Sequence, residues 1–194
     1  MMRPVQAVFI LLIIFSCSAG CSSTAPALSS EPVNNPSDDF STWNLTVNGT
    51  SVSIYTLSQL RALPSTTGHG FAVSTVGIKY GPYTCKGVLL TDLLALSGGI
   101  APGDQVWISA PDGYLWVFDY DQVLGSGFIT FNESLKETPS PPLRILMMYE
   151  QDGKSLSYND GGPLRVAIIS GEKGVVTEGS SWVKWVDKIE IKKK

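Results

Sequence analysis

The sequence predicts an α+β domain that is mainly β, with only short helices. Several segments alternate apolar and polar residues, which is typical of strands that bury one face of a sheet. Helical patterns are confined to two short stretches, Thr56–Pro64 and Thr91–Gly99. Because strands and helices do not alternate regularly, a parallel sheet built of βαβ units is not expected.

The first part of the domain predicts a hairpin followed by a helix. Apolar and polar residues alternate on both sides of Asn48-Gly49, a pair that accepts the positive φ of a tight turn. Thr56 can cap the following helix, and the side chain of Gln59 can complete a capping box with it. Pro64 then ends the helix.

The second part of the domain predicts further strands and one more helix. This helix begins at Thr91 or Asp92, and Gly98-Gly99 provides its C-terminal stop. Two strands are expected on either side of the turn Pro111-Asp112-Gly113. Residues 80–90 lead into this helix, and the remaining strands are expected within residues 142–156, 161–170 and 181–191.

The N-terminus has the pattern of an export signal. Arg3 is a positive n-region, and Ala7–Phe15 is an apolar run shorter than the roughly 20 residues that a spanning helix needs. Small residues follow, and the tetrapeptide ending at Cys21 resembles a lipoprotein cleavage box. We therefore expect a signal peptide over residues 1–20 and a lipid on Cys21. Lipidation of Cys17, an uncleaved anchor and simple secretion are the alternatives.

The segment after the predicted signal has the composition of a flexible tether. Residues 21–41 are rich in Ser, Pro, Asn and Ala and hold almost no large apolar side chains, so they cannot bury enough surface to order themselves. Residues 42–194 are long enough for one domain with a real core. We expect this domain to be exported and anchored to the outer face of the cytoplasmic membrane, with membrane lipid as its partner through Cys21.

The charge pattern excludes one class of partner. The chain carries a formal net charge of −3 and shows no basic stripe with interleaved aromatic residues. Proteins that bind nucleic acid usually present such a stripe, because it neutralises phosphates. No nucleic-acid partner is therefore expected.

Four motifs follow one another along the domain: YTCKGVLLTDLLALSGG, APDGY, GGPLRVAIISGEKG and WVKWVDKIEI. Their order and spacing resemble the molybdopterin-binding domain of the sulfite-oxidase superfamily. The resemblance implies a mixed-sheet, barrel-like fold that holds a molybdopterin cofactor in a cleft. It also implies a molybdenum ion that is bound by the pterin dithiolene and by one cysteine thiolate, a soft ligand that suits such a metal.

The cysteine that the resemblance implies is not in its usual place. In the family it lies upstream of the Gly-Val-x-Leu block, and the matching residues 68–80 hold no cysteine; Ser74 or Thr75 falls near that position. Cys85 lies two residues before Gly87, where relatives often have an aromatic packing residue. We expect Cys85 to pack in the core and to point away from the cleft. A metal ligand and an exposed redox thiol are the alternatives.

Three further residues are candidates for binding the cofactor. His69 lies in a stretch that matches a loop beside the cleft in relatives, and Arg165 and Lys184 match family positions that could meet an anion. Each has a simpler alternative. His69 can be merely exposed to solvent, Arg165 can anchor its strand through a salt bridge, and Lys184 can be an ordinary surface lysine. His69 is also the only possible base for a serine hydrolase, so that class is not expected.

The sequence thus leaves three functions open. We expect a degenerate molybdopterin-binding domain that acts as a binding module for a small ligand or a redox partner, because the family cysteine is missing. An active molybdenum or tungsten pterin oxidoreductase, which uses Cys85 or no protein thiolate, is the first alternative. A surface interaction protein that uses the fold only as a scaffold is the second.

Overall fold

The structure is a computed structural model, and it describes residues 38–194. The predicted signal peptide, Cys17, Cys21 and most of the predicted tether therefore lie outside the described residues. Within residues 38–194, no helix is long and apolar enough to cross a membrane.

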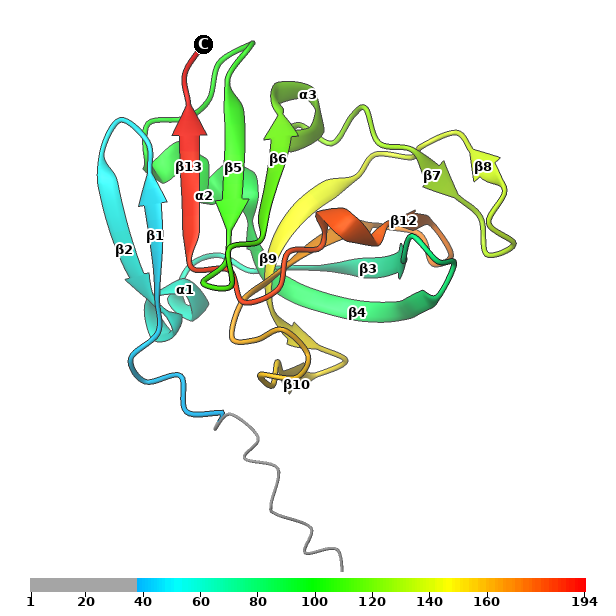
Figure 1. Ribbon diagram of the computed structural model, residues 1–194, viewed down its shortest axis with the longest axis horizontal. Helices are drawn as coiled ribbons and strands as arrows, with labels where there is room; N and C mark the ends of the chain where they lie inside the picture. Colours follow the sequence, from blue (N-terminus) through cyan, green and yellow to red (C-terminus); the bar gives the residue numbers. More distant parts are fainter. Residues whose placement is uncertain (1–37) are drawn as a thin grey trace, which may run out of the picture. The chain divides into compact units, whose positions relative to one another are not determined.

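Two β-sheets and a few short helices make up the domain (Figure 1). The smaller sheet runs in the order β2 (Val52–Thr56), β1 (Asn44–Asn48), β13 (Lys188–Lys192), β5 (Gln105–Ser109) and β6 (Leu115–Asp119). The larger sheet contains β3 (Thr66–Val73), β4 (Lys79–Leu89), β7 (Thr130–Phe131), β8 (Glu137–Thr138), β9 (Arg144–Gln151), β10 (Lys154–Ser155), β11 (Arg165–Ser170) and β12 (Val176–Glu178). The helices are α1 (Leu57–Ala62), α2 (Leu90–Leu96), α3 (Tyr120–Val123) and the 3₁₀ turn η1 (Gly179–Ser181).

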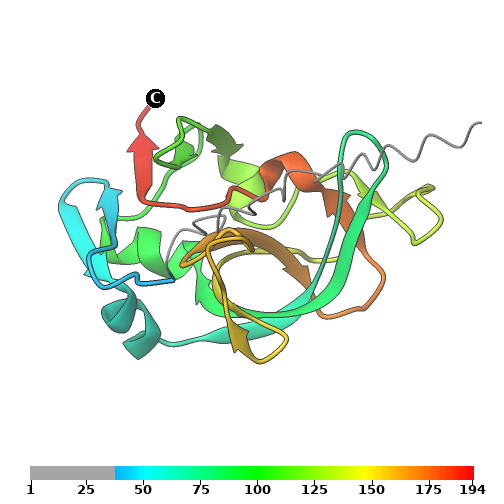
Figure 2. The same ribbon diagram turned by 60° about the horizontal axis from the view of Figure 1, so that its bottom comes forward.

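Four strands of the larger sheet pair in a closed ring. β4 pairs with β3 on one side and with β9 on the other, and β11 joins β9 back to β3. The strong curvature of β3 and β4 that this closure requires is visible in Figure 2. Since β1 and β13 are parallel while most other pairs are antiparallel, the sheets are mixed. The predicted α+β, mainly β, barrel-like fold with short helices is therefore confirmed.

Several local predictions are confirmed because short-range chemistry decides them. The backbone N–H of Gln59 donates to Thr56 Oγ1 at 3.2 Å, and the backbone N–H of Thr56 donates to Gln59 Oε1 at 2.8 Å, which completes the expected capping box of α1. β5 and β6 pair around the expected turn, in which Gly113 has a positive φ. α2 ends at Leu96, and the predicted stop Gly98-Gly99 follows its C-cap with positive φ at both glycines; the helix begins at Leu90, one residue before the expected start.

The turn of the first hairpin differs from its prediction. Gly49, Thr50 and Ser51 connect β1 to β2, and Gly49 does not adopt the positive φ expected of a two-residue turn. A Cβ at this position would lie only 2.2 Å from the Ser97 carbonyl oxygen. Glycine is therefore required here for a close approach of two backbones rather than for a turn conformation.

The closing strand is shorter than the alternating pattern predicts. Only Lys188–Lys192 pair as β13, while Trp185 has a φ of 52° and breaks the strand. The backbone N–H of Trp185 donates to Gly161, and that of Val186 donates to Leu164. This segment therefore runs from η1 past the loop before β11 to the smaller sheet.

Closure of the ring depends on a close approach of β4 and β9 at Gly87. A Cβ on Gly87 would lie 2.1 Å from the Met147 carbonyl oxygen and 2.8 Å from the Met148 Cα. Both are backbone atoms of a strand whose Ile145–Tyr149 segment is fully buried. The two strands can pair at this distance only because residue 87 has no side chain.

We expect Gly87→Ala to lower the free energy of unfolding by about 3 kcal/mol or more, because either strand must shift to admit the methyl group. Urea unfolding followed by circular dichroism measures this loss. Gly171→Ala is the matched control, since no heavy atom lies within 4 Å of a Cβ at residue 171. Equal stabilities of the two variants would contradict the predicted closure of the ring.

Candidate functional site

A pocket of about 400 Å³ lies where the larger sheet meets the chain leading to β13. Ser74, Thr75 and Tyr80 from the end of the β3–β4 hairpin form one wall. The turn between β5 and β6 supplies Asp112 and Tyr114. The other side chains include two cations and two indoles: Arg165, Trp182, Lys184 and Trp185.

Trp182 is the fixed side of this pocket. Its side chain is only 3% exposed, and a Cβ added to Gly70 of β3 would lie 2.6 Å from the Trp182 ring. The indole N–H donates to Thr177 Oγ1 at 3.1 Å, and the Thr177 hydroxyl donates to the Phe71 carbonyl at 3.3 Å. Contact with β3 and this chain of hydrogen bonds therefore hold the indole in one position.

Arg165 is the first residue of β11, and its side chain lies over the Trp182 ring. Its Cζ is 5.5 Å from the ring centroid, and its Nη1 donates to the Asp160 carbonyl at 3.2 Å. The Nε atom is buried and has no acceptor within the described structure. Burial lowers the pKa of Arg165 from its ordinary value, but an arginine remains charged at neutral pH. The side chain thus has unused donor capacity beside the pocket.

Lys184 is held in a similar way by the second indole. Its Nζ is 5.7 Å from the centroid of the Trp185 ring. Gly161, which has a φ of 89°, packs on the stem of the lysine, and a Cβ there would lie 2.5 Å from Lys184 Cγ. Partial burial lowers the pKa of Lys184, and the nearby positive charge of Arg165 lowers it further. Among residues 38–194, neither Lys184 nor Arg165 forms a salt bridge.

Cys85 is buried and does not line the pocket. Its sulfur would lie 2.8 Å from a Cβ on Gly70, so it packs at the same point of β3 as the Trp182 ring. Burial, and to a lesser extent the charge of Asp152, raise the pKa of Cys85 to about 12. The thiol is therefore protonated at neutral pH, and the expected packing of Cys85 in the core is confirmed.

The three candidate cofactor residues do not all meet. Arg165 and Lys184 line one pocket, whereas His69 is not among its lining residues. His69 lies within β3 rather than in a loop, between Gly68 and Gly70. Positions 68 and 70 face Ile169 and Trp182, so strand alternation places the half-buried imidazole on the opposite face of the strand.

The APDGY turn contributes more to the pocket than its sequence indicates. The expected turn forms, and Tyr114, which is 43% exposed, lines the pocket. Its hydroxyl donates to the Ser180 carbonyl at 2.7 Å, which joins the turn to η1. Ser74 also lines the pocket, and its Oγ accepts the backbone N–H of Ile78 at 3.0 Å. The motif order alone could have pointed to this turn, because APDGY is one of the four motifs.

The comparisons with known proteins identify the family of the chain. A family model described as the oxidoreductase molybdopterin binding domain matches residues 32–194. The chain belongs to this family. No curated protein matches the chain.

A solved structure supports the fold. The crystal structure of the sulfane dehydrogenase SoxCD from Paracoccus pantotrophus is similar to this chain, with a TM-score of 0.59 and 20% sequence identity. The similarity covers 78% of this chain and 38% of that one, so this chain corresponds to well under half of the SoxCD chain. At this identity, the likeness shows the fold alone.

The residues of the pocket fit only part of the family cofactor. Arg165 and Lys184 suit the anionic part of a pterin ligand, because neither forms a salt bridge among the described residues; the charge of Asp160 acts on both, but from beyond salt-bridge distance. The metal part lacks its thiolate, since Cys85 is the only cysteine in residues 38–194 and its sulfur is closed off in the core. The same residues include no group of three or more His, Cys, Asp or Glu side chains that could hold a metal ion.

Proposed function

We propose that this protein is an exported, membrane-tethered binding module that has kept the anion-binding part of the molybdopterin-binding fold and has lost its metal-binding thiolate. One observation carries the proposal. Arg165 and Lys184 face one pocket without a salt bridge in the described structure, while the Cys85 thiol is buried and protonated.

The walls of the pocket indicate which ligand it takes. A guanidinium and an ammonium group pair well with phosphate or carboxylate oxygens, and the low polarity around Arg165 strengthens such contacts. Trp182, Trp185 and Tyr80 supply aromatic surface beside these cations. A flat heterocycle that carries a phosphate, as a pterin does, would satisfy both features at once. The domain is therefore proposed to bind a planar anionic ligand of the pterin class.

A second candidate is an active molybdenum or tungsten pterin oxidoreductase that uses no protein thiolate. The observation in its favour is that Ser74 and Thr75, which lie near the family's cysteine position, line the same pocket as Arg165. Hydroxyl oxygens are harder ligands than a thiolate, so they suit this metal site less well. We therefore rank this candidate second.

Pterin and metal analysis of the full chain tests the proposal, with the protein produced in a host that makes the cofactor. We expect bound pterin without stoichiometric molybdenum or tungsten. Arg165→Gln and Lys184→Gln should each lower the retained pterin by about tenfold or more, because each removes a charge-assisted contact. Arg144→Gln is the matched control, since Arg144 is exposed and does not line the pocket.

Three results would contradict the proposal in different ways. Stoichiometric molybdenum that is lost in Cys85→Ala would assign the metal to the buried thiol. Stoichiometric molybdenum that Cys85→Ala retains would favour the oxidoreductase without a protein thiolate. A folded protein that retains neither pterin nor metal would favour a surface interaction protein that uses the fold as a scaffold.

The membrane tether is a separate part of the proposal, and it rests on the N-terminal sequence. We expect Cys21→Ser to abolish incorporation of labelled palmitate and to move the protein from the membrane fraction to the soluble exported fraction. Cys17→Ser is the matched control and should leave both properties unchanged. If labelling is lost in Cys17→Ser but not in Cys21→Ser, the lipid is on Cys17 and this part of the proposal is wrong.

A further inference from the structure

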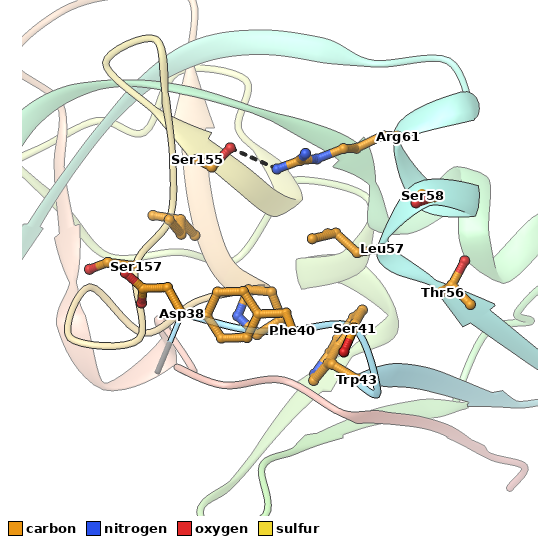
Figure 3. A pocket seen from close by; sticks show the side chains of 12 residues that line it. Asp38, Phe40, Ser41, Trp43, Thr56, Leu57, Ser58, Arg61, Ser155 and Ser157 are labelled. Carbon is orange, nitrogen blue, oxygen red and sulfur yellow. Dashed lines mark hydrogen bonds between the residues drawn. The ribbon is translucent and has the colours of Figure 1, made fainter. Parts of the chain in front are cut away.

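A second pocket, of about 430 Å³, lies on another part of the domain. Its walls come from the chain before β1, from α1 and from the segment around β10 (Figure 3). Arg61 and Ser155 lie at one end, Phe40 and Trp43 lie at the other, and Leu57 is between them (Figure 3). None of these residues lines the pocket that contains Arg165.

The Arg61 end of this pocket is rich in hydrogen-bond donors. Arg61 Nη2 donates to Ser155 Oγ at 2.8 Å, and its Cζ lies 5.5 Å from the centroid of the buried Tyr149 ring. These two contacts hold the guanidinium in place but leave its other N–H groups available. In the described structure, Arg61 has no salt bridge to an acidic side chain.

The opposite end adds a donor and an apolar surface. Trp43 Nε1 is buried and has no acceptor within residues 38–194, which is unusual because buried indole N–H groups are normally paired. Phe40, Leu57 and Pro163 supply apolar surface to the same pocket. Asp38 is the only acidic residue in the lining, and its Oδ1 already accepts the backbone N–H of Tyr158 at 2.7 Å.

We propose that this pocket binds a small organic carboxylate with an apolar or aromatic body. A carboxylate offers only acceptors, which matches the unused N–H donors of Arg61. Its two oxygens fit the paired N–H groups of the guanidinium, and its body fits the surface of Phe40 and Leu57. The proposal is independent of the function of the Arg165 pocket.

Calorimetric titration of the full chain with benzoate tests the proposal, and benzamide serves as the neutral match of the same shape. We expect benzoate to bind about tenfold or more tightly than benzamide, and Arg61→Gln to abolish this difference. Arg144→Gln makes the same change in charge at an exposed site away from the pocket and should leave binding unchanged.

Equal binding of benzoate and benzamide, or no binding of either, would overturn the proposal. The same holds if Arg61→Gln and Arg144→Gln weaken benzoate binding equally, because that would indicate a general charge effect. Loss of benzoate binding in Arg165→Gln, with binding retained in Arg61→Gln, would place the anion in the other pocket and would also overturn it.

Discussion

The contact between Trp182 and Gly70 is the constraint on which the candidate site depends. A Cβ on Gly70 would meet the Trp182 ring at 2.6 Å and the Cys85 sulfur at 2.8 Å, so only glycine admits both neighbours. The indole in this position provides the face over which Arg165 lies. The absence of a side chain at Gly70 therefore serves two properties: it lets the indole that carries Arg165 lie against β3, and it leaves room for the Cys85 sulfur in the core.

The loop between β10 and β11 connects the two pockets of the domain. Asp38, which lines the Arg61 pocket, accepts the backbone N–H of Tyr158. The Tyr158 carbonyl accepts the Trp185 indole N–H at 2.8 Å, and the two aromatic rings lie 5.3 Å apart. Trp185 in turn lies beside Lys184 in the Arg165 pocket. The first described residues of the domain are thus joined to the Arg165 pocket through a short series of hydrogen bonds and ring contacts.

The sequence predicts this structure well where local chemistry or motif order decides it. The capping box of Thr56 and Gln59 and the turn at Gly113 need only neighbouring residues. Motif order singled out Arg165 and Lys184, which line one pocket, and their role in binding a cofactor stays a prediction. Features that depend on distant neighbours were not predictable. The face on which His69 lies follows from the register of β3, and Gly49 is required by Ser97, which is remote in sequence. The Arg61 pocket joins three separate segments that share no motif.

Chemical labelling of Cys85 in the full chain tests most directly the central claim that the thiol is sealed away from the pocket. Iodoacetamide at pH 8 would be applied to the native and to the unfolded protein, and peptide mass spectrometry would resolve each cysteine. With a pKa of about 12, only about one thiol in ten thousand is ionised at this pH. We predict no labelling of Cys85 in the native protein and complete labelling after unfolding. Rapid labelling of Cys85 in the native protein would contradict the account, because it would mean that the sulfur is open to a ligand or a metal.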